Sequence, residues 1–188
     1  MKYTFVATLA VLLLVGPGTA AQGPVSLLDG TSLNGWTISG DANWRPGDGG
    51  VEADGGRGHL VTDGSYRDFV LTTEFWVDEP ANSGVFIRCE DRDAVGPNSC
   101  YEVNIFDQRP DPSYRTGAIT NFASAAVEIV AAGKWNTLEI RAEGARLVVA
   151  LNGTVTADIE DSTHAEGPIT LQYFAGVVKF RNLQIQTL

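Results

Sequence analysis

Short runs that alternate apolar and polar residues follow one another from residue 25 onward, separated by Gly, Asp, Asn and Pro. In residues 69–77 (FVLTTEFWV), Leu71, Phe75 and Val77 share one face, which is the two-residue period of a β-strand. Comparable runs predict strands at 60–63, 84–89, 101–107, 135–142, 147–151, 169–174 and 177–185. Strands at this spacing, joined by turns, predict an all-β sandwich or barrel.

Turn signals support this pattern, and helical signals are nearly absent. Asn152-Gly153 is the strongest two-residue hairpin signal, and Glu143-Gly144 predicts a second turn. Residues 123–132 contain alanines, but their β-branched residues disfavour a helix. We therefore expect a loop there, with at most one helical turn.

The N-terminus has the pattern of a secretory signal peptide. Lys2 precedes an apolar run of about 11 residues, which is shorter than the roughly 20 that cross a bilayer. Small residues follow, so we expect residues 1–21 to be a signal peptide and residues 22–188 to form a single domain. A retained membrane anchor is the alternative. The expected location is secreted or periplasmic.

Composition limits the classes of partner. Hydrophobic residues make up 44% of the chain, which is enough for a core, and the net charge is −10. Such a charge predicts repulsion from nucleic acid and anionic lipid, and no membrane contact after signal cleavage. The same charge favours solubility, with an acidic calcium site as the alternative. The sequence does not predict the oligomeric state.

Cys89 and Cys100 are the two cysteines, and an even number in an exported protein predicts a disulfide. That bridge would stabilise the fold by about 3 kcal/mol in the chain-entropy model. The histidines, His59 and His164, lack metal-ligand spacing and are interpreted as structural or surface residues. No cofactor is firmly predicted. A divalent metal such as calcium is left open because residues 90–93 (EDRD) carry three carboxylates.

Polar residues on otherwise apolar strands are the candidates for a binding site. Glu74, Arg88, Glu102 and Asn104 alternate with apolar positions, so neighbouring strands could gather them on the outer face of one sheet. Such a set of donors and acceptors suits sugar hydroxyls. Ordinary cross-strand ion pairs are the alternative explanation. Aromatic residues that could stack on a sugar, or simply fill the core, are Trp36, Trp44, Trp76 and Tyr173.

A series of motifs resembles the 3-keto-disaccharide hydrolase domain family, formerly a domain of unknown function. They match in order over nearly all of the expected mature chain: residues 27–36 (LLDGTSLNGW), 66–69 (YRDF), 82–88 (NSGVFIR), 101–107 (YEVNIFD), 116–119 (TGAI), 135–136 (WN), 151–153 (LNG), 167–172 (GPITLQ) and 180–182 (FRN). The resemblance implies a concanavalin-A-like jelly-roll sandwich of two antiparallel sheets. It also implies activity on glycosides oxidised at carbon 3.

Such a substrate needs one base near the carbon 2 proton and a group that stabilises the developing oxyanion. By motif position, Glu102 is the candidate base, Arg88 the candidate anion stabiliser, and Asp107 a third catalytic candidate. Candidate substrate-binding residues are Asn104, Gln172, Glu74 and Trp76.

The sequence also departs from the family pattern. Relatives often have a His two residues after the Gln of "LQ", where this chain has Phe174, and Asn104 replaces the usual Gln. Relatives often have a His before the "NG" turn, where this chain has Val149-Ala150. The prediction is a secreted hydrolase or lyase acting on 3-keto-glycosides. The alternatives are a non-catalytic carbohydrate-binding module and an envelope protein without a sugar ligand.

Overall fold

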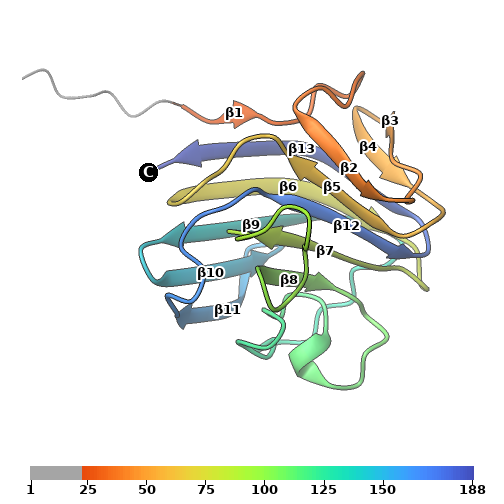
Figure 1. Ribbon diagram of the computed structural model, residues 1–188. Helices are drawn as coiled ribbons and strands as arrows, with labels where there is room; N and C mark the ends of the chain where they lie inside the picture. The colour runs from red at the N-terminus through yellow and green to blue at the C-terminus, as the bar shows by residue number, and fades with distance from the viewer. Residues whose placement is uncertain (1–22) are drawn as a thin grey trace, which may run out of the picture.

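The computed structural model describes residues 23–188, which form a two-layer β-sandwich (Figure 1). One layer is a five-stranded sheet in the order β2-β5-β12-β7-β8, and the other is an eight-stranded sheet in the order β11-β10-β9-β6-β13-β4-β3, with β1 also paired to β13. All strand pairs are antiparallel. The predicted fold class, a concanavalin-A-like sandwich, is therefore confirmed.

The strands of the five-stranded sheet are β2 (Trp36–Gly40), β5 (Gly58–Thr62), β12 (Thr170–Ala175), β7 (Asn82–Ile87) and β8 (Tyr101–Ile105). Those of the eight-stranded sheet are β1 (Val25–Ser26), β3 (Arg45–Gly47), β4 (Gly50–Ala53), β6 (Phe69–Val77), β9 (Trp135–Glu143), β10 (Arg146–Leu151), β11 (Thr154–Glu160) and β13 (Val178–Thr187). A 3-10 helix, η1 (Pro112–Tyr114), lies in the connection between β8 and β9.

The core lies between the sheets because each strand turns alternate side chains inward. In β6 the inward residues, Phe69, Leu71 and Phe75 among them, are fully buried, and the residues between them are half-buried. The inward, buried residues of the five-stranded sheet include Leu60, Leu171, Val85 and Val103. Their burial fixes the register of each strand, and the register decides which polar residues reach the outer faces.

The turn predictions are confirmed. Asn152 and Gly153 both have positive φ, 52° and 79°, and join β10 to β11 as a two-residue turn of this kind requires. Gly144, with φ of 55°, lies in the turn between β9 and β10. Residues 123–132 carry no helix or strand, as expected.

Strands β1 to β4 and β11 were not predicted individually. In β11 the outward and inward positions are mixed in polarity, and the register with β10 shifts between Val149 and Ala150. An irregular register breaks the period of two on which the prediction depends.

Residues 1–21, the predicted signal peptide, lie outside the described residues. Among residues 23–188, no helix has the length and apolar character needed to cross a bilayer.

Candidate functional site

The outer face of the five-stranded sheet carries two neighbouring rows of side chains, one residue from each strand. Because Leu60, Leu171, Val85 and Val103 point inward, their chain neighbours point outward. The first row follows from the register and contains Ser39, His59, Gln172, Gly84 and Asn104. The second row contains Thr37, Val61, Thr170, Phe86 and Glu102. The front layer of Figure 1 shows the strands in this order.

Glu102 is the buried acid of this surface. Only 8% of the residue is exposed, and burial raises the pKa of its carboxyl to about 7, against a smaller opposing effect of the Thr120 hydroxyl. The carboxyl leans over Gly84, since a Cβ added to that glycine would lie 3.4 Å from Oε1 of Glu102. A group with this pKa exchanges its proton near neutral pH, as a general base does.

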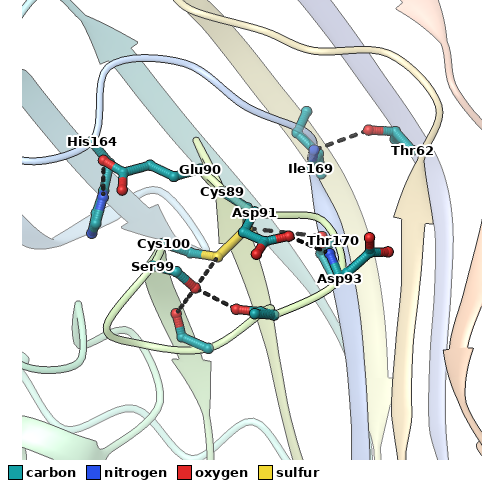
Figure 2. Close-up of a disulfide and its surroundings, with 12 residues drawn as sticks. Thr62, Cys89, Glu90, Asp91, Asp93, Ser99, Cys100, His164, Ile169 and Thr170 are labelled. Carbon is teal, nitrogen blue, oxygen red and sulfur yellow. Dashed lines mark hydrogen bonds and ion pairs between the residues drawn. A yellow bond between two sulfur atoms is a disulfide. The ribbon is translucent and has the colours of Figure 1, made fainter.

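A loop segment and an aromatic side chain flank Glu102. On one side, the segment 117–120 adds to the edge of β8, with the backbone N–H of Thr120 donating to the carbonyl of Glu102 at 2.9 Å. On the other side, Phe86, the cross-strand partner of Glu102, packs with the Cys89–Cys100 disulfide. The predicted disulfide is thus present (Figure 2), and it closes the connection between β7 and β8.

His59 of β5 and Gln172 of β12 are cross-strand partners and lie side by side in the first row. Nε2 of His59 and Oε1 of Gln172 are buried, and within residues 23–188 neither has a hydrogen-bond partner. The His59 ring meets Phe86 edge-on, with 5.3 Å between centroids, and burial lowers the pKa of the imidazole to about 4. The imidazole is therefore neutral at neutral pH.

Sequence reasoning missed His59. The predicted strand began at residue 60, whereas β5 begins at Gly58. Extending the alternation of Leu60 backward would have placed His59 on the outer face. On the same face, Phe174 is 42% exposed, with the Arg57 guanidinium 4.2 Å from its ring centroid.

Asn104 and Asp107 are close to Glu102 in sequence but bond to loop backbone. Asn104 lies on the same face, and its amide donates to the carbonyl of Tyr114 at 2.6 Å. Asp107 accepts hydrogen bonds from the Thr116 hydroxyl at 2.5 Å and from the backbone N–H groups of Ala131 and Ala132, both at 2.8 Å. These contacts organise the loops beyond β8.

Arg88 does not join Glu102 and Asn104, contrary to the expectation that the three project together. Strand β7 ends at Ile87 and Arg88 has a φ of 52°, so its side chain leaves the alternation. The guanidinium is 1% exposed and donates to the carbonyls of Arg67 and Gly144 at 2.8 Å and to Asp68 at 3.0 Å. It ties together the loops at one end of the sandwich.

Glu74 and Trp76 lie on the other sheet, contrary to the expectation of one cluster. Both point outward from β6. The carboxylate of Glu74 pairs with Nε of Arg181 at 2.6 Å, and this contact holds its pKa below the usual range. Nζ of Lys179 lies 5.8 Å from the Trp76 ring centroid. The other aromatic candidates, Trp36, Trp44 and Tyr173, are core residues.

The acidic loop after β7 does not gather its carboxylates. Glu90 turns toward His164, with 3.1 Å between Oε1 and Nδ1, whereas Asp91 accepts from the backbone N–H of Asp93 on the other side of the disulfide (Figure 2). In the part of the chain that the structure describes, no group of three or more His, Cys, Asp or Glu side chains is placed to hold a metal ion.

Solved structures with this architecture include proteins from two bacteria. A candidate glycosyl hydrolase from Parabacteroides distasonis superposes with a TM-score of 0.79 at 18% identity, covering 88% of this chain and 94% of its own. A second candidate glycosyl hydrolase from that organism gives 0.70 at 24% identity, covering 82% and 100%. The carbohydrate binding module CBM66 from Bacillus subtilis gives 0.66 at 21% identity, covering 81% and 96%.

At these identities the superpositions show the fold alone. No curated protein matches the chain at a significant level. The sequence profile of the 3-keto-alpha-glucoside-1,2-lyase-like domain family matches residues 23–186, which is nearly all of the chain. The chain therefore belongs to this family of 3-keto-disaccharide hydrolase-like domains.

Proposed function

We propose that the protein cleaves 3-keto-glycosides on the outer face of the five-stranded sheet, with Glu102 as the general base. The observation that carries this proposal is the Glu102 carboxyl, buried over Gly84 with its pKa raised to about 7. Family membership supports the carbohydrate chemistry. Glycine at position 84 adds no side chain at the point where the Glu102 carboxyl lies, and we place the sugar ring against that carboxyl.

The 3-keto group makes one base sufficient, because it acidifies the proton on carbon 2. The Glu102 carboxylate takes that proton, and the electron pair of the broken C–H bond forms an enolate with the keto oxygen. The enolate collapses back to the ketone, a double bond forms between carbons 1 and 2, and the bond from carbon 1 to the leaving oxygen breaks. That oxygen takes up the proton that Glu102 removed, which restores the Glu102 carboxylate. Water adding across the double bond completes a net hydrolysis.

We also propose that this reaction takes place outside the cytoplasm. The Cys89–Cys100 disulfide supports this location, because disulfides persist in oxidising compartments. The apolar run of the N-terminal segment is consistent with export.

The test compares purified wild-type protein with Glu102→Gln on 3-keto disaccharides and on the parent disaccharides. Removal of a general base is expected to lower kcat by about 10²- to 10⁴-fold on the 3-keto compound. Glu74→Gln, the same change on the other sheet, is the matched control and should keep full turnover. Unchanged turnover in Glu102→Gln would contradict the proposal. Saturable sugar binding by the wild type without any product would instead favour a carbohydrate-binding module.

A further inference from the structure

Two shielded polar atoms on the outer face of the five-stranded sheet have no structural explanation in the free protein. Nε2 of His59 and Oε1 of Gln172 are buried and unpartnered within residues 23–188. Leaving such a group unpaired destabilises the folded protein, because its hydrogen bonds to water are lost and not replaced. Unpaired groups of this kind are uncommon in folded proteins and mark strain, a bound water or a functional site.

Both atoms belong to the row that contains Gly84. Gln172 is the direct cross-strand partner of His59 on one side and of Gly84 on the other. His59 and Gly84 are therefore two strand spacings apart, about 10 Å between backbones. Across this interval, His59 and Gln172 lie at one end and the Glu102 carboxyl lies over the other. A single sugar ring fits such a distance.

The chemistry of the row selects among ligands. The neutral imidazole offers one donor and one acceptor, and the Gln172 amide offers both kinds of group. A hydroxyl can donate and accept, so it can satisfy either side chain. An anionic group over Gly84 would meet the Glu102 carboxylate, and the chain as a whole carries a charge of −10. The row therefore suits neighbouring hydroxyls on a neutral ring.

We propose that His59 and Gln172 form hydrogen bonds to the hydroxyl groups of a neutral sugar ring bound over Gly84, and so determine the specificity for the sugar. This inference rests on the proposed function in taking the outer face of the five-stranded sheet as the sugar site. His59 is the new element, and it acts through hydrogen bonds to hydroxyls that do not react. Its partner Phe86 holds the ring edge-on and limits its rotation.

The test uses His59→Phe and Gln172→Leu, which keep the approximate shape while removing the polar atoms. Binding is measured by calorimetry with trehalose and its monodeoxy analogues, which lack the 3-keto group and are therefore not turned over. KM for 3-keto-trehalose is measured with Glu102 intact. Gln184→Leu, on the outer face of the eight-stranded sheet, is the matched control.

Each variant should weaken binding of trehalose and raise KM by about tenfold, the loss expected for a hydrogen bond to a ligand. The deoxy analogue that lacks the recognised hydroxyl should bind the wild type about tenfold more weakly than trehalose does. The variant that has lost the matching side chain should bind this analogue no worse than it binds trehalose. Thermal midpoints without sugar should stay equal or rise, because an unpaired buried group has been removed. Gln184→Leu should change none of these constants.

Two results overturn the inference while leaving the proposed function intact: unchanged KM in both variants, or a lowered thermal midpoint with unchanged affinity. If the wild type binds trehalose without turning over the 3-keto sugar, and the variants lose that binding, the proposed function fails and the inference stands. Absence of saturable binding to any sugar overturns both.

Discussion

The outer faces of the two sheets carry similar side chains, but they differ in how those side chains are paired. On the eight-stranded sheet the charges are matched: Glu74 with Arg181 at 2.6 Å, and Arg146 with Asp158 at 2.8 Å. Its indole rings are covered by cations, with the Arg181 guanidinium 3.8 Å from the centroid of Trp135. On the five-stranded sheet, Glu102 is buried without a cation that lowers its pKa, and His59 and Gln172 keep unpartnered atoms.

This difference supports the proposal that the ligand binds on the five-stranded sheet and not on the solvated face of the eight-stranded sheet. Exposed pairs gain little because water already solvates both partners. A buried carboxyl with a raised pKa lowers the stability of the folded state whenever it is ionised, and sites that keep such a group commonly use it. The state of pairing, rather than the residue types, is therefore the reason to place the proposed site on the five-stranded sheet.

The strongest test of this contrast is to make the same substitution on both faces. The pKa of Glu102 rises from 4.5 to about 7 in the folded protein. As pH rises from 4.5 to 7, the unfolded chain releases this proton more readily than the folded one, so stability falls by roughly 3 kcal/mol. Glu102→Gln should therefore be more stable than wild type at pH 8 by up to about 3 kcal/mol, and similar to it at pH 4.

Glu74→Gln should change stability at pH 8 in the opposite direction. Arg181 lowers the pKa of Glu74, so its ionised form stabilises the fold above the unfolded pKa, and this contribution is lost as pH falls. The pair is half-buried and still reached by solvent, and we expect a loss below about 1 kcal/mol at pH 8. Urea unfolding of both variants at pH 4 and pH 8 measures the difference. A destabilised Glu102→Gln protein at pH 8 would contradict the assignment of Glu102.

Removing the disulfide should test how Glu102 is buried. Cys89→Ala with Cys100→Ala should cost about 3 kcal/mol in the chain-entropy model. It should also loosen the cover over Phe86, admit water to Glu102 and lower its pKa toward 4.5. The rise of kcat/KM with pH, expected near pH 7 in wild type, should move to lower pH. An unchanged inflection would show that the segment 117–120 alone maintains the burial.

The sequence predicted the sandwich because its longest strands alternate cleanly. Residues 69–77 match β6, and the inward set of β8 follows the predicted apolar face. The two cysteines were also paired as predicted. These features depend on local periodicity and composition, which a single sequence contains.

The site was harder to predict because it depends on which strands become neighbours. Alternation placed Glu74 and Glu102 on equivalent outward positions, but nothing in the sequence assigned β6 and β8 to different sheets. Arg88 left its predicted face because one residue with positive φ ended the alternation. Gln172 and Asn104 do lie on the face of Glu102, and His59 joins them only through its pairing with β12.

Gly84→Ala should give an intermediate effect. The added methyl group would lie 3.2 Å from the Val103 carbonyl and 3.4 Å from the Glu102 carboxyl, so it would occupy the space proposed for the sugar. We expect kcat/KM to fall by about tenfold, equivalent to about 1.4 kcal/mol. Gly47→Ala in β3 is the control, because its methyl group would meet only the flexible Glu52 side chain, 3.0 Å away. Equal activity of both variants would place the sugar elsewhere.

The smallest effects should come from the eight-stranded face itself. Arg181→Ala removes the ion pair to Glu74 and uncovers the Trp135 ring, yet it should change stability by less than about 1 kcal/mol and leave sugar affinity within about twofold. Trehalose titrations and urea unfolding measure both quantities. A large loss of affinity would reverse the contrast between the faces, because Glu74 and Trp76 would then be the sugar-binding residues. Even an increase would be informative, since it would mean that Arg181 shields a ring on which a sugar can stack.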